Sequence, residues 1–163
     1  MGVVLGLSLN EVEELCQKVK GVVEVSIVNT RHQIVVSGEG SAVDQLLKLG
    51  MESEALKTDR LPAAAPYHCS LLAPADQCLA KWLSKISMNE PHTPIISYIN
   101  HKPLAEASQV AELLSIQLRS QVRWVGVVEK LVQENLAYMV EVGPCQMLDR
   151  SVRWIHRQAQ VLS

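Results

Sequence analysis

The chain has 163 residues, of which 48% are hydrophobic and 20% charged, with a formal net charge of −2. This composition can fill one domain, or one small domain and part of another, and offers no basic, aromatic-rich stretch for nucleic acid. No run of about 18 apolar residues could span a membrane, and no secretory signal opens the chain, so we expect a cytoplasmic protein.

The first 62 residues predict short strands alternating with amphipathic helices. Residues 3–5 are an apolar strand, and Ser8-Leu9-Asn10-Glu11 fits the capping box that starts a helix, which Gly21 ends. Three further strands are expected at 22–28, 33–37 and 55–61, with a polar turn at 29–32 and a second helix over 43–51. This β-α-β-β-α-β order predicts a ferredoxin-like small subdomain over residues 1–62.

The remaining residues, 63–163, have a different pattern. Helices are predicted at 70–86, 110–121, 125–135 and 147–160, and continuous apolar strands at 95–99 and 137–142. Strands alternating with helices imply parallel pairing in an α/β sheet. Two such buried strands cannot make a covered parallel sheet alone, so we expect that part of this domain lies outside the sequence.

A constrained loop precedes the first helix of this second part. Pro62 and Pro66 prevent a helix across residues 61–68, because each fixes its own φ and pushes the residue before it towards an extended conformation. His68 therefore lies on a rigid loop at the mouth of a helix, where catalytic residues often occur. Histidine is the usual general base near neutral pH, although a packed structural histidine is the alternative.

Five stretches in one order carry a family resemblance. They are V-V-L-G-L at 3–7, N-T-R-H-Q-I-V-V-S-G at 29–38, P-Y-H-C-S-L-L at 66–72, Q-L at 117–118 with V-R-W at 122–124, and E-V-G-P at 141–144. Over essentially its whole length, the chain resembles malonyl-CoA:acyl carrier protein transacylase and the related acyltransferase domains of polyketide and fatty acid synthases. The resemblance implies a ferredoxin-like subdomain and, over residues 63–163, the carboxy-terminal portion of an α/β-hydrolase-like large subdomain.

The resemblance also implies a reaction and its partners. In the family, a serine in a G-H-S-x-G motif takes the malonyl group from coenzyme A, helped by a histidine base and an arginine that binds the malonyl carboxylate. The group then passes to the phosphopantetheine thiol of acyl carrier protein, which is covalent catalysis by an activated hydroxyl. Malonyl-CoA is the implied substrate, in fatty acid or polyketide synthesis, and no bound cofactor is implied.

Three residues match site positions of the family. His68 matches the catalytic histidine, and Gln117 matches a glutamine near the active site, where a backbone carbonyl partly orients the histidine. Asn29 matches an asparagine that lines the cleft between the subdomains. From the residues alone, Gln117 could equally be a helix-surface side chain and Asn29 a turn residue.

The serine motif of the family does not occur in this sequence. The nearest approach is Gly6-Leu7-Ser8-Leu9-Asn10, but Asn10 stands where the motif needs Gly, and the capping box accounts for Ser8. We therefore expect the chain to be the carboxy-terminal half of an acyltransferase, inactive alone, with the missing amino-terminal half as a partner. Cys145 replaces a usual Gly after Gly143-Pro144, which puts that turn in doubt.

Other chemistry is weakly indicated. The four cysteines are scattered and fit reduced thiols better than disulfides or a metal site, and the other histidines show no ligand spacing. Arg119 and Arg123 could meet a coenzyme A phosphate, although a solvated face explains them as well. Two alternative functions remain open: the acyltransferase subunit of malonate decarboxylase, and a non-catalytic module that binds a carrier protein.

Overall fold

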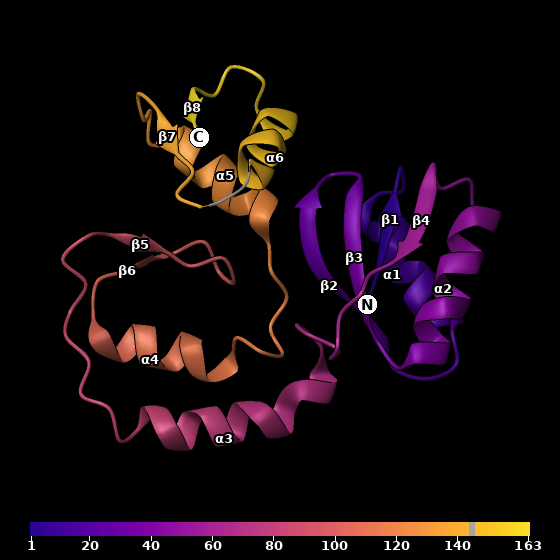
Figure 1. The fold of residues 1–163 in the computed structure, drawn as a ribbon, viewed down its shortest axis with the longest axis horizontal. Coiled ribbons are helices and arrows are strands. Elements are labelled where there is room, and N and C mark those ends of the chain that lie inside the picture. Colours follow the sequence, from indigo (N-terminus) through magenta and orange to yellow (C-terminus); the bar gives the residue numbers. More distant parts are fainter. Residues whose placement is uncertain (144–145) are drawn as a thin grey trace.

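The computed structural model describes residues 1–143 and 146–163, and its elements form three groups (Figure 1). One is a four-stranded sheet with two helices, built from residues 2–60. The second contains the helices α3 and α4, which run side by side, and the third contains α5 and α6 near the C-terminus. None of the helices within these described ranges is both long and apolar enough to cross a membrane.

The sheet unit has the predicted order of elements. They are β1 (Gly2–Leu5), α1 (Leu9–Lys18), β2 (Val23–Thr30), β3 (Gln33–Gly38), α2 (Gly40–Glu52) and β4 (Lys57–Arg60). The strands lie in the order β2-β3-β1-β4, and every neighbouring pair is antiparallel. Helices α1 and α2 pack against each other and against the sheet. The mixed α/β fold predicted from the sequence is confirmed.

Local sequence signals explain the first helix. The backbone N–H of Glu11 donates to Ser8 Oγ at 3.4 Å, and the Ser8 N–H donates to Glu11 Oε2 at 2.7 Å, which completes the capping box. The helix ends at Lys18, and Gly21 follows with a φ of 104°, a conformation that favours glycine. Both helix signals predicted from the sequence are thus found in the structure.

The turn between β2 and β3 is shorter than predicted. Strand β2 continues to Thr30, so Asn29 is a strand residue, and only Arg31 and His32 form the turn. The Thr30 side chain accepts a hydrogen bond from the His32 N–H at 3.3 Å, which stabilises the tight connection. The polar side chains of residues 29–32 suggested a longer turn. The pairing with β3 extends the strand instead, and this tertiary interaction cannot be seen in the local sequence.

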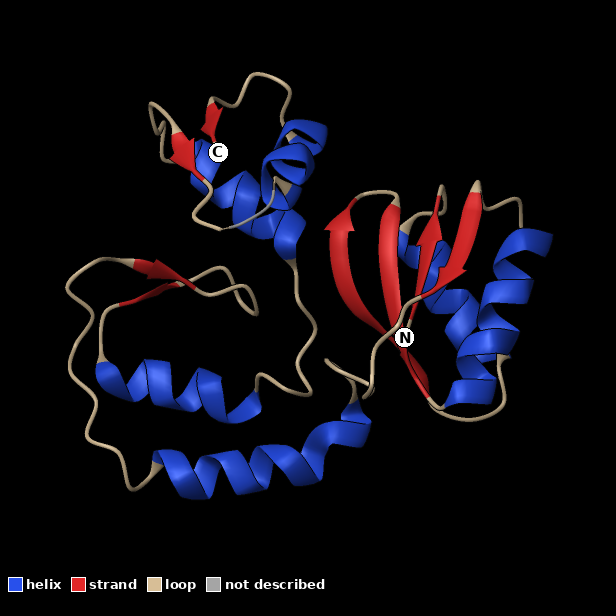
Figure 2. Cartoon of the chain, in the orientation of Figure 1, coloured by secondary structure: helices blue, strands red, loops and turns tan. Residues whose placement is uncertain are grey.

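The second part of the chain contains more helix than strand (Figure 2). Its elements are the 3-10 helix η1 (Ser70–Leu72), α3 (Ala73–Leu83), β5 (Ile95–Ile96), β6 (Pro103–Leu104), α4 (Ala107–Ile116), α5 (Trp124–Gln133), β7 (Met139–Val140), α6 (Met147–Ile155) and β8 (Val161–Leu162). Strands β5 and β6 pair antiparallel, and β7 and β8 pair parallel. Helices α5 and α6 also contact β2, which links this part to the sheet unit.

The two long strands predicted for this part are only two residues each. Within the described residues, β5 and β7 each have one two-residue partner, so most of each apolar run has no strand to pair with. A strand ends where its backbone partners end, because unpaired N–H and C=O groups must meet water. The predicted parallel pairing is wrong for 95–99, and β6 and β8 were not predicted.

The apolar core is concentrated in the sheet unit. It includes Val4, Val12, Ile34, Val36, Val43 and Leu46, all fully or almost fully buried. A smaller cluster joins Val128, Val152 and Val161 on α5, α6 and β8. By contrast, many large apolar side chains of the second part are exposed, including Trp82, Ile86, Ile95, Tyr138, Val140, Val142, Met147 and Trp154.

Candidate active site

The loop that carries His68 is fixed by backbone contacts on both sides. His68 has a φ of 58°, in the left-handed region, and its N–H donates to the carbonyl of Leu118 at 2.7 Å. Two residues later, the Ser70 N–H donates to the Glu24 carboxylate of β2 at 2.9 Å, and the Ser70 hydroxyl also donates to it. The loop is therefore held between the sheet unit and the segment that follows α4.

Two carbonyl oxygens determine the tautomer of the neutral His68 ring. Its Nδ1 lies 3.1 Å from the backbone oxygen of Gln117 and 3.1 Å from that of Ser120. Carbonyl oxygens only accept hydrogen bonds, so Nδ1 must carry the proton of the neutral ring. The lone pair is then on Nε2, to which no hydrogen bond runs from the part of the chain that the structure describes. This is the tautomer that a general base requires.

The segment carrying these carbonyls is itself attached to β2. Val122 forms a parallel bridge with Ile27: its N–H donates to the Ser26 oxygen at 2.9 Å, and its oxygen accepts from the Val28 N–H at 2.8 Å. The Gln121 side chain adds a hydrogen bond to the Val25 oxygen at 3.2 Å. Residues 117–122 thus connect the histidine loop to the most regular part of the fold.

Tyr98 supplies one wall of the site. Its ring meets the His68 ring edge to face, with 6.3 Å between centroids and an angle of 85° between planes. Its hydroxyl donates to Gln117 Oε1 at 3.1 Å, and partial burial raises the pKa of that hydroxyl. Gln117 therefore uses its side chain to bind Tyr98 and its backbone oxygen to bind His68.

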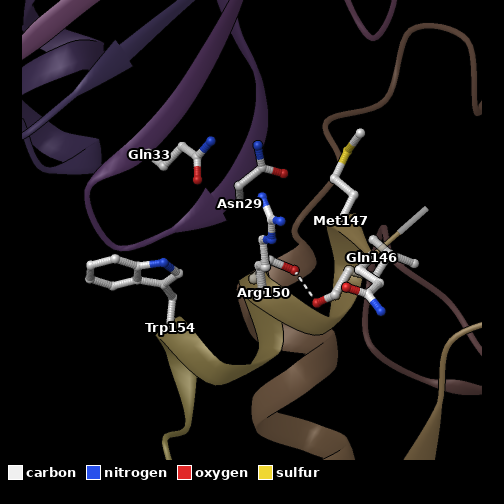
Figure 3. A pocket seen from close by; sticks show the side chains of 8 residues that line it. Asn29, Gln33, Gln146, Met147, Arg150 and Trp154 are labelled. Carbon is white, nitrogen blue, oxygen red and sulfur yellow. Dashed lines mark hydrogen bonds between the residues drawn. The ribbon is translucent and has the colours of Figure 1, made fainter. Parts of the chain in front are cut away.

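Asn29 lies at a different place. Together with Gln33 and the start of α6, it lines a cavity of about 500 Å³, where Arg150 and Trp154 also lie (Figure 3). No hydrogen bond joins Asn29 to His68 among the described residues. The structure therefore brings Gln117 to His68 and leaves Asn29 on the face of β2 that meets α6.

Two other residues singled out from the sequence, Ser8 and Arg119, have structural partners. Ser8 caps α1 through Glu11, as the sequence predicted. The guanidinium of Arg119 forms an ion pair with Asp76 rather than facing solvent freely. Cys145 lies outside the described residues.

The cysteines and acidic residues do not form a metal site in the part of the chain that is described, where no three His, Cys, Asp or Glu side chains cluster. Burial raises the pKa of the Cys16 thiol to about 11 and also raises the pKa of the Cys69 thiol. Cys69, the residue after His68, is fully buried. Both thiols are therefore protonated near neutral pH and are poor nucleophiles.

Three contributors to the site were missed from the sequence. Ser120 provides a carbonyl oxygen, Tyr98 provides the ring, and Asp76 binds the segment that carries the carbonyls. A backbone oxygen has no sequence signal of its own. An acidic residue in the first turn of a predicted helix, such as Asp76, is ordinarily explained by the helix dipole.

Comparison with known proteins shows which enzymes the chain is similar to. No protein-family model matches the chain. Over 165 aligned residues, covering the whole chain, it is 30% identical to the malonyl CoA-acyl carrier protein transacylase of Haemophilus influenzae, and it is 24% identical to the enzyme of that name from Staphylococcus aureus. The chain spans about half the length of these curated relatives, 53% and 54% respectively.

Solved structures give the same result. The transacylase of Coxiella burnetii superposes with a TM-score of 0.95 at 31% identity, over 99% of this chain and 52% of that one. A malonyl-transacylase in complex with a type II polyketide acyl-carrier protein also reaches 0.95, at 26% identity, over 98% of this chain and 52% of that one.

The fold is of the mixed α/β class, and the relatives that share it are named as acyl carrier protein transacylases. More particularly, the chain is similar over its whole length to the carboxy-terminal part of malonyl-CoA acyl carrier protein transacylases, which confirms the resemblance seen in the sequence.

Proposed function

We propose that this chain supplies the general base of a malonyl-CoA:acyl carrier protein transacylase, and that His68 is that base. The observation that carries the proposal is the pair of carbonyl oxygens, on Gln117 and Ser120, at 3.1 Å from His68 Nδ1. They keep the proton on Nδ1 and the lone pair on Nε2. The transacylase names of the relatives favour this function over the decarboxylase subunit.

The reaction would proceed in two transfers. His68 Nε2 takes the proton of a serine hydroxyl, and the serine oxygen attacks the malonyl thioester carbon. The C–S bond breaks, and the imidazolium returns its proton to the coenzyme A sulfur, which leaves as a thiol. In the second transfer, the phosphopantetheine thiol of acyl carrier protein gives its proton to Nε2, and its sulfur attacks the acyl-serine carbon. The C–O bond to serine breaks, and the imidazolium returns the proton to the serine oxygen, which restores the hydroxyl.

The serine belongs to the part of the transacylase fold that this sequence does not cover. We propose that this part also covers the apolar side chains exposed on the second half of the chain, of which Trp82, Val140 and Val142 are 66%, 58% and 94% exposed. Large exposed apolar patches are typical of surfaces that another polypeptide segment covers. A complete enzyme of this kind would act in the cytoplasm on malonyl-CoA.

A chimeric enzyme tests the proposal. The amino-terminal half of the Haemophilus influenzae relative is joined to this chain, and malonyl transfer to acyl carrier protein is measured. The chimera should be active, and His68→Gln should reduce its rate by about 10²- to 10⁴-fold, the usual contribution of a general base. The matched control, His92→Gln, changes an exposed histidine and should leave the rate unchanged.

Two results would contradict the proposal. One is an active chimera in which His68→Gln reacts as fast as the parent. The other is covalent labelling of this chain alone by malonyl-CoA, because a base without its serine cannot form an acyl-enzyme.

A further inference from the structure

Asp76 is a buried carboxylate next to the segment that holds His68. It lies in the first turn of α3 and is 4% exposed, although aspartate seldom lies in a protein interior without partners. Its Oδ1 accepts a hydrogen bond from the Leu118 N–H at 3.2 Å, and its Oδ2 lies 3.0 Å from Arg119 Nε. Both partners belong to the short segment between α4 and α5.

The same peptide group binds Asp76 on one side and His68 on the other. The Leu118 N–H and the Gln117 carbonyl belong to one peptide unit, and in a trans peptide these two groups point in opposite directions. The N–H donates to Asp76, while the carbonyl lies 3.1 Å from His68 Nδ1. Asp76 therefore fixes the orientation of the carbonyl that His68 uses.

We propose that Asp76 is a positioning residue, which acts on His68 through the Gln117–Leu118 peptide. The inference rests on the proposed function of His68. Two consecutive hydrogen bonds join the carboxylate, the peptide group and the imidazole, so the peptide takes the place of a direct carboxylate–imidazole contact.

Two physical effects support this role. A carboxylate that accepts an N–H makes a stronger hydrogen bond than a neutral acceptor does. It also polarises the peptide, so that the carbonyl on the far side becomes a better acceptor for the Nδ1 proton. The ion pair with Arg119, whose side chain is half exposed, holds the carboxylate in place. The Leu118 oxygen also accepts the His68 N–H at 2.7 Å, so the segment binds the histidine at its ring and its backbone.

The tautomer of His68 tests the proposal directly. Imidazole nitrogen signals of the ¹⁵N-labelled chain are recorded at a pH where the ring is neutral, and the His68 signals are assigned by their loss in His68→Gln. The parent should show the Nδ1–H tautomer. Asp76→Ala should lower the ratio of Nδ1–H to Nε2–H by about fivefold, which corresponds to one net hydrogen bond. Asp76→Asn keeps an acceptor without charge and should give a smaller decrease.

Asp149→Asn is the matched control, because Asp149 also pairs with an arginine on a helix but does not contact the His68 segment. It should leave the tautomer ratio unchanged. An unchanged ratio in folded Asp76→Ala would overturn the proposal, as would an equal decrease in Asp149→Asn. If Asp76→Ala does not fold, an unchanged ratio in Asp76→Asn overturns it. The measurement involves no acyl transfer, so a negative result here leaves the proposed function standing, and an inactive chimera leaves this inference standing.

Discussion

Truncating a buried and an exposed isoleucine should have very different effects on stability. Ile34 lies in β3 and is 0% exposed, whereas Ile95 lies in β5 and is 43% exposed. Ile34→Ala removes three carbon groups from the core, worth about 2.4 kcal/mol at roughly 0.8 kcal/mol each, and leaves a cavity that brings the cost to about 3–4 kcal/mol. For Ile95→Ala, the buried share of the side chain limits the loss to about 1.4 kcal/mol, without a cavity term.

Urea unfolding followed by circular dichroism measures both free energies of unfolding. If the sheet unit unfolds in a separate step, Ile34→Ala should move only that step, because its contacts lie within the core of residues 4–55. A loss for Ile95→Ala as large as that for Ile34→Ala would refute the reasoning. It would mean that Ile95 is packed in a core like that of β3, as a long buried strand over 95–99 would require.

Two further predictions concern polar groups. Ser8→Ala removes the N-cap of α1 and should cost about 1 kcal/mol at pH 7 in thermal or urea unfolding. Hydrogen bonds from the Ser8 side chain and backbone lower the pKa of Glu11, so they stabilise the folded state above the ordinary carboxyl pKa. The difference in the free energy of unfolding between Ser8→Ala and the parent should therefore shrink as the pH falls below about 4. A difference that grows in acid would contradict this prediction. Among Cys16, Cys69 and Cys78, a disulfide reagent at pH 8 should modify exposed Cys78 first, because burial raises the pKa of the other two thiols. Mass spectrometry identifies the first modified residue, and modification of Cys16 or Cys69 before Cys78 would contradict the prediction.

The sheet unit could be predicted from the sequence because its signals are local. The capping box at Ser8 and the glycine after α1 each act over a few residues, and tertiary contacts agree with them. The exception is Asn29, whose polar side chain suggested a turn although cross-strand pairing placed it in β2.

The second part could be predicted less well because its elements depend on distant partners. Residues 95–99 have the composition of a buried strand, but only two of them pair, with β6. Parallel pairing of β7 with β8 depends on residues 161–162, which follow α6 and carry no strand pattern of their own. Propensity indicates what a segment can form, and available backbone partners decide whether it does.

The sequence indicated some side chains of the candidate site and missed others, among them Tyr98 and Asp76. The two prolines before His68 indicated a constrained loop, and the family resemblance indicated Gln117. The oxygens that contact the imidazole are backbone atoms of Gln117 and Ser120, whose positions depend on how α4 ends. The buried partner Asp76 comes from another helix, 42 positions away from Leu118, so no sequence spacing could indicate it.

The left-handed backbone at His68 has an evolutionary consequence. A φ of 58° is unfavourable for most side chains that have a β-carbon. Glycine and asparagine adopt it with the least strain. A mutant library screened only for heat resistance should therefore enrich glycine or asparagine at position 68, while a screen of the chimeric enzyme for malonyl transfer should retain the imidazole. The two screens would then select different residues at position 68. The difference between their residue frequencies would measure how much stability is lost at this position for the sake of catalysis.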